Sequence, residues 1–142
     1  MEEKITYFEE SGTKNTGETF RLAIERAQAR GITRLVVAST TGDNARTAAK
    51  MLAGTGLKMV VVPQQWGFAE KHRFPAELVP ELQKQGHSVY FGTMLFHTTS
   101  FYGTDTPAAM ANLLRTFSPG MKVCVEVLIM ATNGGQINIG ER

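Results

Sequence analysis

The sequence predicts a doubly wound α/β fold with a mostly parallel sheet. Short apolar runs at residues 35–38 and 58–62 are rich in β-branched side chains, and each is followed by a turn or loop and then a helical pattern. Glycines such as Gly31 and Gly54 separate these segments. Strands that alternate with helices in this way form parallel sheets through right-handed crossovers.

The composition bounds the class of protein. A length of 142 residues fits a single domain, residues 1–142, and the contents of 42% apolar and 20% charged residues are ordinary for a globular chain. The net charge of +2 is spread along the chain, so nucleic acid is not an expected partner. No apolar run approaches a membrane span, and the acidic start lacks a signal-peptide pattern. With only Cys124 available, no internal disulfide can form, and we expect a cytoplasmic protein without membrane contact.

The first elements expected are a short strand over residues 5–8 and a helix that ends before Gly31. Asn15 or Thr16 fits the N-cap of this helix, and Glu18 can close a capping box with it. Apolar residues then recur at helical spacing until the glycine, which favours the left-handed conformation that ends helices.

The middle of the chain predicts three strands and two helices. We expect strands at residues 35–38, 58–62 and 88–91, a helix at residues 44–53, and a helix with Pro75 in its first turn that ends at Gly86. The first of these strands has an unbroken apolar character, which predicts that it is buried on both faces.

The C-terminal part predicts two helices. An irregular hydroxyl-rich stretch at residues 93–106 precedes a helix from Pro107 to about Thr116, and Ser118 with the following proline begins the last helix. That helix is apolar almost all round and is expected to lie deep in the domain. Only residues 136–142 follow its glycines, too few for a crossover and a full strand. Either the sheet is small, or the chain ends before its fold would normally close.

The turn after residues 35–38 is the main candidate site. Its residues are Ser39, Thr40, Thr41, Gly42, Asp43, Asn44 and Ala45. Such a turn presents backbone N–H groups and hydroxyls at the positive end of a helix, where a phosphate group binds well. The same turn also joins strands to helices in proteins that bind nothing, with its hydroxyls acting as caps. In a parallel sheet it lies at the carboxyl edge, where ligands bind.

Other segments are expected at the same edge. The cap residues Asn15 and Thr16, the loop Trp66-Gly67-Phe68 and the stretch after Phe91 can surround one crevice with the turn. The caps serve either the helix alone or a ligand. The aromatic rings either pack against the protein or stack on a flavin or nucleotide ring.

No catalytic or metal-binding set stands out in the sequence. The three histidines are scattered without metal-ligand spacing. Glu126 lies in an otherwise apolar helix, so it is either a functional carboxylate or half of a salt bridge or solvent-facing edge. Cys124 is expected to be a small core residue.

Several stretches together resemble a known family. They are Asn15-Thr16 with Glu18-Thr19 and Leu22-Ala23, residues 35–45, Gly67-Phe68, Leu113-Leu114, and Lys122-Val123-Cys124-Val125-Glu126. The turn resembles the phosphate-holding loop of the pyruvate kinase C-terminal α/β domain. Nearly the whole chain resembles small stand-alone proteins described as pyruvate kinase α/β domain-like.

The resemblance implies a three-layer α/β/α fold that holds flavin mononucleotide (FMN) at the turn. It implies no pyruvate kinase activity, because the catalytic groups of that enzyme belong to a barrel domain that this chain lacks. Members of the family continue after the position of Arg142 with a strand and a second glycine-rich turn. The chain is therefore expected to be C-terminally truncated or closed by a partner subunit, and to form a homo-oligomer.

The function expected from the sequence is binding of a phosphorylated small molecule, with FMN as the leading ligand. Two alternatives stay open at this point. One is a flavin-dependent oxidoreductase of unknown substrate. The other is a regulatory or assembly module without catalysis, by analogy with the effector role of the related domain.

Overall fold

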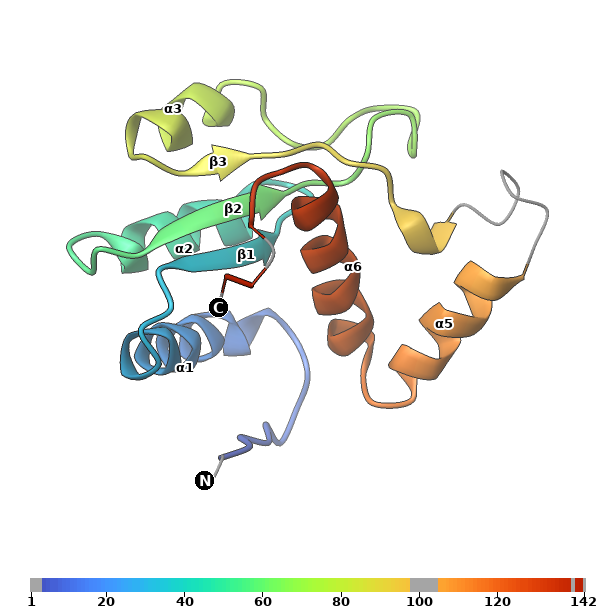
Figure 1. Ribbon diagram of the computed structural model, residues 1–142, viewed down its shortest axis with the longest axis horizontal. Helices are drawn as coiled ribbons and strands as arrows, with labels where there is room; N and C mark the ends of the chain where they lie inside the picture. The colour runs from blue at the N-terminus through green and yellow to red at the C-terminus, as the bar shows by residue number, and fades with distance from the viewer. Residues whose placement is uncertain (1–3, 98–104, 139, 142) are drawn as a thin grey trace.

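The computed structural model describes residues 4–97, 105–138, 140 and 141. Helices and strands alternate along the first two thirds of the chain, and two helices follow (Figure 1). The α-helices are α1 (Thr16–Ala29), α2 (Asp43–Leu52), α3 (Leu78–Lys84), α5 (Thr106–Arg115) and α6 (Pro119–Asn133). The strands are β1 (Arg34–Ala38), β2 (Lys58–Val62) and β3 (Ser88–Val89), and the short 3-10 helices are η1 (Thr13–Asn15) and η2 (Leu95–His97).

The described strands form one parallel sheet in the order β1-β2-β3. This confirms the predicted α/β class with a parallel sheet, although the sheet has only three strands. The central strand β2 is almost wholly buried, with Val60 and Val61 fully inaccessible to solvent. In β1 Val37 is buried and the other residues are partly buried, with Leu35 packed on one face of the sheet and Val36 and Ala38 packed on the other. The expectation that this strand is covered on both faces is therefore confirmed in part. The strand is less buried than β2 because it lies at the edge of the described sheet and has one neighbouring strand.

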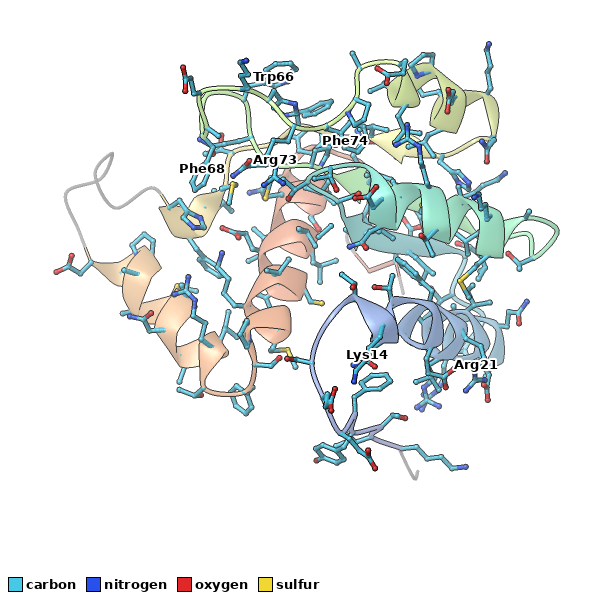
Figure 2. All side chains as sticks on the ribbon, turned by 180° about the vertical axis from the view of Figure 1, so that it is seen from behind. Lys14, Arg21, Trp66, Phe68, Arg73 and Phe74 are labelled. Carbon is cyan, nitrogen blue, oxygen red and sulfur yellow. The ribbon has the colours of Figure 1, made fainter. Side chains whose placement is uncertain are left out.

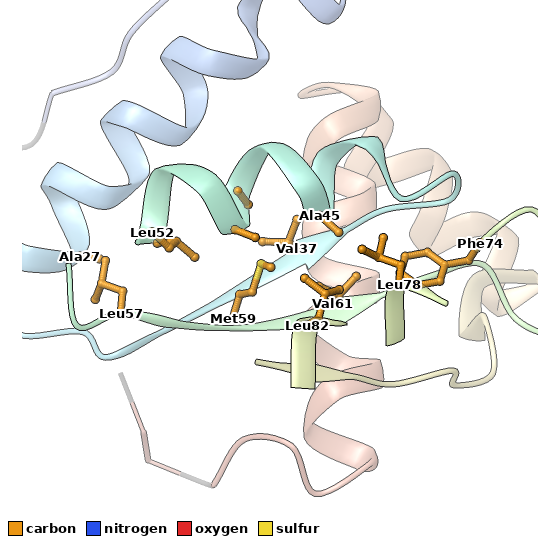
Figure 3. Packing of buried hydrophobic residues seen from close by; sticks show 12 residues of the cluster. Ala27, Val37, Ala45, Leu52, Leu57, Met59, Val61, Phe74, Leu78 and Leu82 are labelled. Carbon is orange, nitrogen blue, oxygen red and sulfur yellow. The ribbon is translucent and has the colours of Figure 1, made fainter. Parts of the chain in front are cut away.

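Helices cover both faces of the sheet. Met59 and Val61 point toward one face, where they pack with residues of α1, α2 and α3 (Figure 3). Val60 and Val62 point toward the other face and pack with the C-terminal half of α6. This follows from the strand geometry, in which successive side chains alternate between faces. The sheet therefore lies between two helical layers.

The N-terminal segment differs from the prediction. The strand expected over residues 5–8 does not form, and Ile5 remains 74% exposed because the segment pairs with no strand. The capping box is also absent. Asn15 makes no side-chain cap and donates instead to the carbonyl oxygen of Glu10, while Glu18 binds Arg21 one helical turn later, at 2.7 and 2.8 Å. The helix α1 therefore begins where the sequence predicted, but the predicted capping hydrogen bonds of Asn15 and Glu18 do not form.

The helix α3 begins later than expected, and the strand β3 is shorter than expected. Pro75 precedes α3 instead of lying in its first turn, since the helix begins at Leu78. The predicted end at Gly86 is confirmed to within one residue, because the C-cap is Gln85. β3 covers only two of the expected residues and leaves Phe91 outside the strand.

The last helix is correctly placed but less buried than predicted. Ser118 is its N-cap, and its hydroxyl oxygen accepts from the Met121 N–H at 2.9 Å, as the sequence predicted. Leu128 is 50% exposed and Cys124 is also exposed, so the predictions of a deeply buried helix and a core cysteine were wrong. One sheet face can cover only one side of a helix. Of the hydroxyl-rich stretch at residues 93–106, positions 98–104 lie outside the described residues, as do residues 1–3 and Arg142.

Candidate functional site

The turn between β1 and α2 has backbone N–H groups without a hydrogen-bond partner among the described residues. No described hydrogen bond uses the backbone N–H of Thr40, Thr41, Gly42, Asp43 or Asn44. These groups precede or begin a helix of ten residues, whose N-terminus carries a partial positive charge. The arrangement satisfies the local requirements for binding an anion.

The hydroxyl groups of the turn differ in what they can still donate. The Ser39 oxygen accepts the N–H of Ala45 at 3.2 Å, which leaves its own proton available. Thr40 has no side-chain hydrogen bond to a described residue. Thr41 donates its proton to the Asp43 carboxylate at 2.6 Å. Two of the three hydroxyls can therefore donate to a phosphate oxygen without breaking an existing bond.

Gly42 has a packing role of its own. Its φ of 89° is in the left-handed region that favours glycine, and it is the N-cap residue of α2. A Cβ built here would lie 2.8 Å from the Leu78 side chain and 3.1 Å from Pro75, so the α3 side of the fold already fills the space beside it. It would also lie 2.9 Å from Nη1 of Arg46, which places a guanidinium beside the turn. The glycine is thus required even without a ligand.

A cavity of about 140 Å³ opens where β1 and β2 end. Ser39 and Thr40 form its wall on the β1 side, and Gln64 lies on the β2 side. The buried side of α6 forms the opposite wall and contributes Lys122 and Glu126. The start of the candidate turn therefore shares a cavity with two charged side chains from a distant part of the chain.

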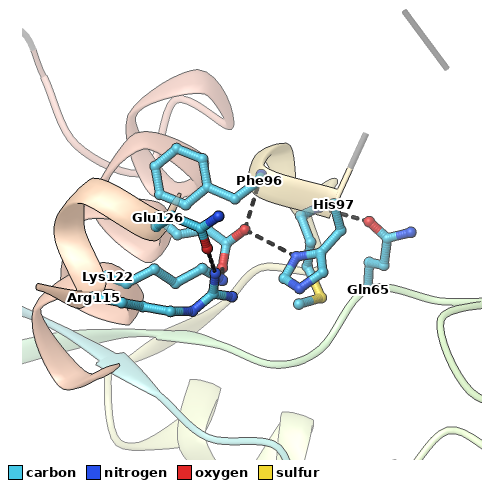
Figure 4. Close-up of polar contacts among 8 residues, drawn as sticks. Gln65, Phe96, His97, Arg115, Lys122 and Glu126 are labelled. Carbon is cyan, nitrogen blue, oxygen red and sulfur yellow. Dashed lines mark hydrogen bonds and ion pairs between the residues drawn. The ribbon is translucent and has the colours of Figure 1, made fainter. Parts of the chain in front are cut away.

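Lys122 and Glu126 form a buried ion pair in this wall (Figure 4). They are 5% and 3% exposed, and the Lys122 Nζ lies 2.5 Å from Oε2 of Glu126. The other carboxylate oxygen accepts the Phe96 N–H at 3.0 Å and lies 3.3 Å from Nδ1 of His97. The ammonium also lies 5.5 Å from the centre of the Phe96 ring. Of the two readings that the sequence left open for Glu126, the salt bridge is confirmed, and it is buried.

The loop after β2 brings aromatic rings close to this wall. Phe68 lies edge-on to His97, with ring centres 5.1 Å apart, and His97 in turn contacts Glu126. Trp66 stacks on His72 at 3.9 Å and is largely exposed. Gly67 joins the two aromatic residues with a φ of 78°. Figure 2 shows Trp66 and Phe68 on one side of the molecule, with Phe68 on the side of η2.

Asn15 and Thr16 stand apart from this cavity. Neither lines it, and the Asn15 amide is used within the N-terminal segment. Lys14, the residue before them, lies well away from Trp66 and Phe68 in Figure 2. The fold thus brings together the turn, the residues that follow β2 and the stretch after Phe91, but not the start of α1. A ligand role for Asn15 and Thr16 stays a prediction.

A larger hollow of about 600 Å³ lies elsewhere, between the N-terminal segment and α1. Its lining includes Lys4 and Phe8 from the segment and Leu22 from the helix. Residues 5–8 pair with none of the described strands, and none of the residues that line this hollow is buried. The smaller cavity, with its buried charges, is therefore the better candidate.

Lys122 is the residue of this site that the sequence reasoning missed. The available signal was the spacing of a lysine and a glutamate four residues apart in an otherwise apolar helix. Such a pair lies on one helical face, so both charges had to be exposed or both buried together. Gln65, whose side-chain oxygen accepts the Met94 N–H at 2.6 Å, was also missed and fixes the loop before η2.

Three further observations concern membrane-spanning helices, metal-binding groups and known protein families. Among the described residues, no helix has the length and apolar character needed to cross a bilayer. Nor do the described parts of the chain contain a group of three or more histidine, cysteine or acidic residues that could hold a metal ion. No protein-family model matches the sequence.

Proposed function

We propose that this protein binds a phosphorylated small molecule, with the phosphate held by the turn between β1 and α2. The observation that carries the proposal is that the consecutive backbone N–H groups from Thr40 to Asn44, at the start of a helix, have no acceptor among the described residues. The available protons of Ser39 and Thr40 add donors on the cavity side. The Arg46 guanidinium and the helix N-terminus both favour a negative charge there.

FMN is the ligand that we propose first, and its parts fit the site differently. A cavity of about 140 Å³ suits a phosphate-sized group, whereas pockets for whole drug-sized ligands are typically about 300–1,000 Å³. The flavin ring would therefore lie outside the cavity, toward the loop with Trp66, Gly67 and Phe68. Trp66 and Phe68 are 65% and 42% exposed, and aromatic rings of this kind can stack on a planar ring.

We further propose that the sheet and its two helical layers form the core of a fold like the pyruvate kinase C-terminal domain. The support is the parallel order of the strands, the helices on both faces and the turn at the carboxyl edge. Such a protein would bind an effector-like phosphate without pyruvate kinase activity.

Two measurements test the proposed ligand. The absorbance spectrum of freshly purified protein should show the visible bands of a bound flavin. Isothermal titration calorimetry with FMN, riboflavin and inorganic phosphate should give binding of FMN and phosphate, with riboflavin weaker than FMN. Equal and negligible heats for all three compounds would overturn the proposal.

We also propose that the chain self-associates. Leu113 of α5, Phe117 in the turn after it and Leu128 of α6 are at least half exposed, and large exposed apolar side chains often mark interfaces. Sedimentation velocity should show a species heavier than 15.6 kDa at micromolar concentration. A monomer at all concentrations would contradict this.

A further inference from the structure

We propose that Lys122 is the residue that makes the site specific for a phosphorylated ligand. This inference rests on the proposed function and assigns to the phosphate a cationic partner from α6. The ammonium lines the same cavity as Ser39 and Thr40, so a group held at that end of the turn faces Lys122 across the cavity.

The hydrogen bonding of Lys122 points to a further acceptor. An ammonium group has three N–H donors, and among the described residues Nζ of Lys122 bonds only to Glu126. Lys122 is 5% exposed, so little of it reaches open solvent. A buried charge is stable only when it is well paired, and a phosphate oxygen in the cavity would supply a second anionic acceptor.

Glu126 is a positioning residue in this arrangement. One of its oxygens is fixed by the Phe96 N–H and by His97, and the other holds the Lys122 ammonium. The ammonium therefore has a defined place in the wall, which spares the ligand the cost of ordering a flexible lysine. Lys122 can donate to a neutral oxygen as well, but its hydrogen bond to an anionic phosphate is charge-assisted on both sides and therefore stronger.

The discriminating experiment compares FMN with riboflavin, which have the same ring and differ in the phosphate. The variants are Lys122→Met, which removes the charge at similar length, and the double variant Lys122→Met/Glu126→Gln, which leaves no unpaired buried charge. Lys50→Met, at an exposed position on α2, is the control for a general loss of positive charge. Circular dichroism confirms that each variant is folded before calorimetry.

We expect the ratio of FMN to riboflavin affinity to fall about tenfold or more in the double variant, as for loss of one charged hydrogen bond. Riboflavin affinity should stay within twofold, and Lys50→Met should behave as wild type. A ratio that is unchanged in a folded Lys122 variant overturns the inference while the proposed function stands. Failure of the wild-type protein to bind either FMN or phosphate overturns the proposed function, and this inference with it.

Discussion

The two faces of the sheet are built from different chemistry. The face covered by α2 and α3 has a continuous apolar core in which Met59, Val61 and Leu82 are almost inaccessible to solvent. The face covered by α6 has a smaller apolar cluster, and beside it the same helix buries Lys122 and Glu126. Both faces use the alternating side chains of the same strands. The difference teaches that the first face serves mainly stability, while the second accepts buried charge next to a cavity.

That difference has an energetic consequence. Burying an ion pair removes two charges from water, and well-packed apolar residues in the same place are often equally stable or more stable. The pair is therefore not needed to hold α6 on the sheet, where Val127 and Met130 already pack. The binding role that we propose would account for the buried ion pair on this face.

The largest effect is expected from breaking the ion pair. Lys122→Met leaves Glu126 buried without its cation and should lower the free energy of unfolding by about 3–5 kcal/mol. The double variant with Glu126→Gln should recover a large part of this loss, because no buried charge remains. Urea denaturation followed by circular dichroism measures both. A single variant as stable as wild type would mean that the carboxylate is not desolvated in solution.

The apolar face should respond strongly to the loss of volume. Leu82→Ala, at a fully buried site on α3, should cost about 2–5 kcal/mol in the same denaturation experiment. The matched change Leu128→Ala, at a half-exposed site on α6, should cost well under that. Equal losses at the two sites would erase the proposed contrast between the two faces, or show that an assembly buries Leu128.

A comparison of Ser39 with Ser118, whose hydroxyl oxygens make similar hydrogen bonds, can distinguish an effect on stability from an effect on ligand binding. The oxygens of Ser39 and Ser118 each accept a backbone N–H near the start of a helix, at 3.2 and 2.9 Å. Replacing either by alanine should cost about 1 kcal/mol of unfolding free energy. Only Ser39→Ala should also weaken FMN binding in calorimetry. A loss of binding in both variants, or in neither, would contradict the assignment of Ser39 to the ligand site.

The smallest effect concerns His87, which is buried beside β2. Burial, with a smaller effect of the Lys58 ammonium, holds the pKa of His87 below its ordinary value. Its Nδ1 accepts the Met59 N–H at 3.3 Å, which requires the neutral ring. Because the unfolded chain takes up this proton first, stability should be complete above the ordinary pKa of about 6.5 and fall as the pH drops below it.

The variant His87→Asn tests this pH dependence. Its side-chain oxygen can accept the same N–H but does not titrate. Denaturation midpoints between pH 7.5 and pH 5 should decline more steeply for the wild-type protein than for the variant. Parallel slopes would show that His87 is not the group responsible.

Local patterns in the sequence predicted much of the fold. The apolar run that Pro63 closes predicted β2 with its observed ends, and Ser118 with the following proline predicted the start of α6. Residues 5–8 show the limit of such patterns, because a strand also needs a neighbouring strand and they pair with none in the described part of the chain. The apolar surface of α6 wrongly predicted a deeply buried helix for a similar reason. The burial of a helix depends on how much of the fold covers it, which its own sequence does not show.

The candidate site could likewise be predicted from the sequence only in part. The turn from Ser39 to Ala45 could be located from the sequence, because a strand, a turn and a helix start are consecutive. That Lys122 faces this turn depends on how α6 crosses the carboxyl edge of the sheet, about eighty residues later in the chain. The i, i+4 spacing of Lys122 and Glu126 could have indicated that the two side chains lie together, but it could not have indicated where in the fold they lie.

The most direct test of the account follows the amide signals of the turn. In a ¹⁵N-labelled sample titrated with inorganic phosphate at constant ionic strength, the N–H signals of residues 40–44 should shift together and saturate, because these donors are unspent in the fold. Chloride at the same ionic strength is the control. Saturating shifts confined to this turn are the predicted result. Unchanged turn signals, or shifts only at exposed lysines, would contradict the claim that the turn holds the phosphate.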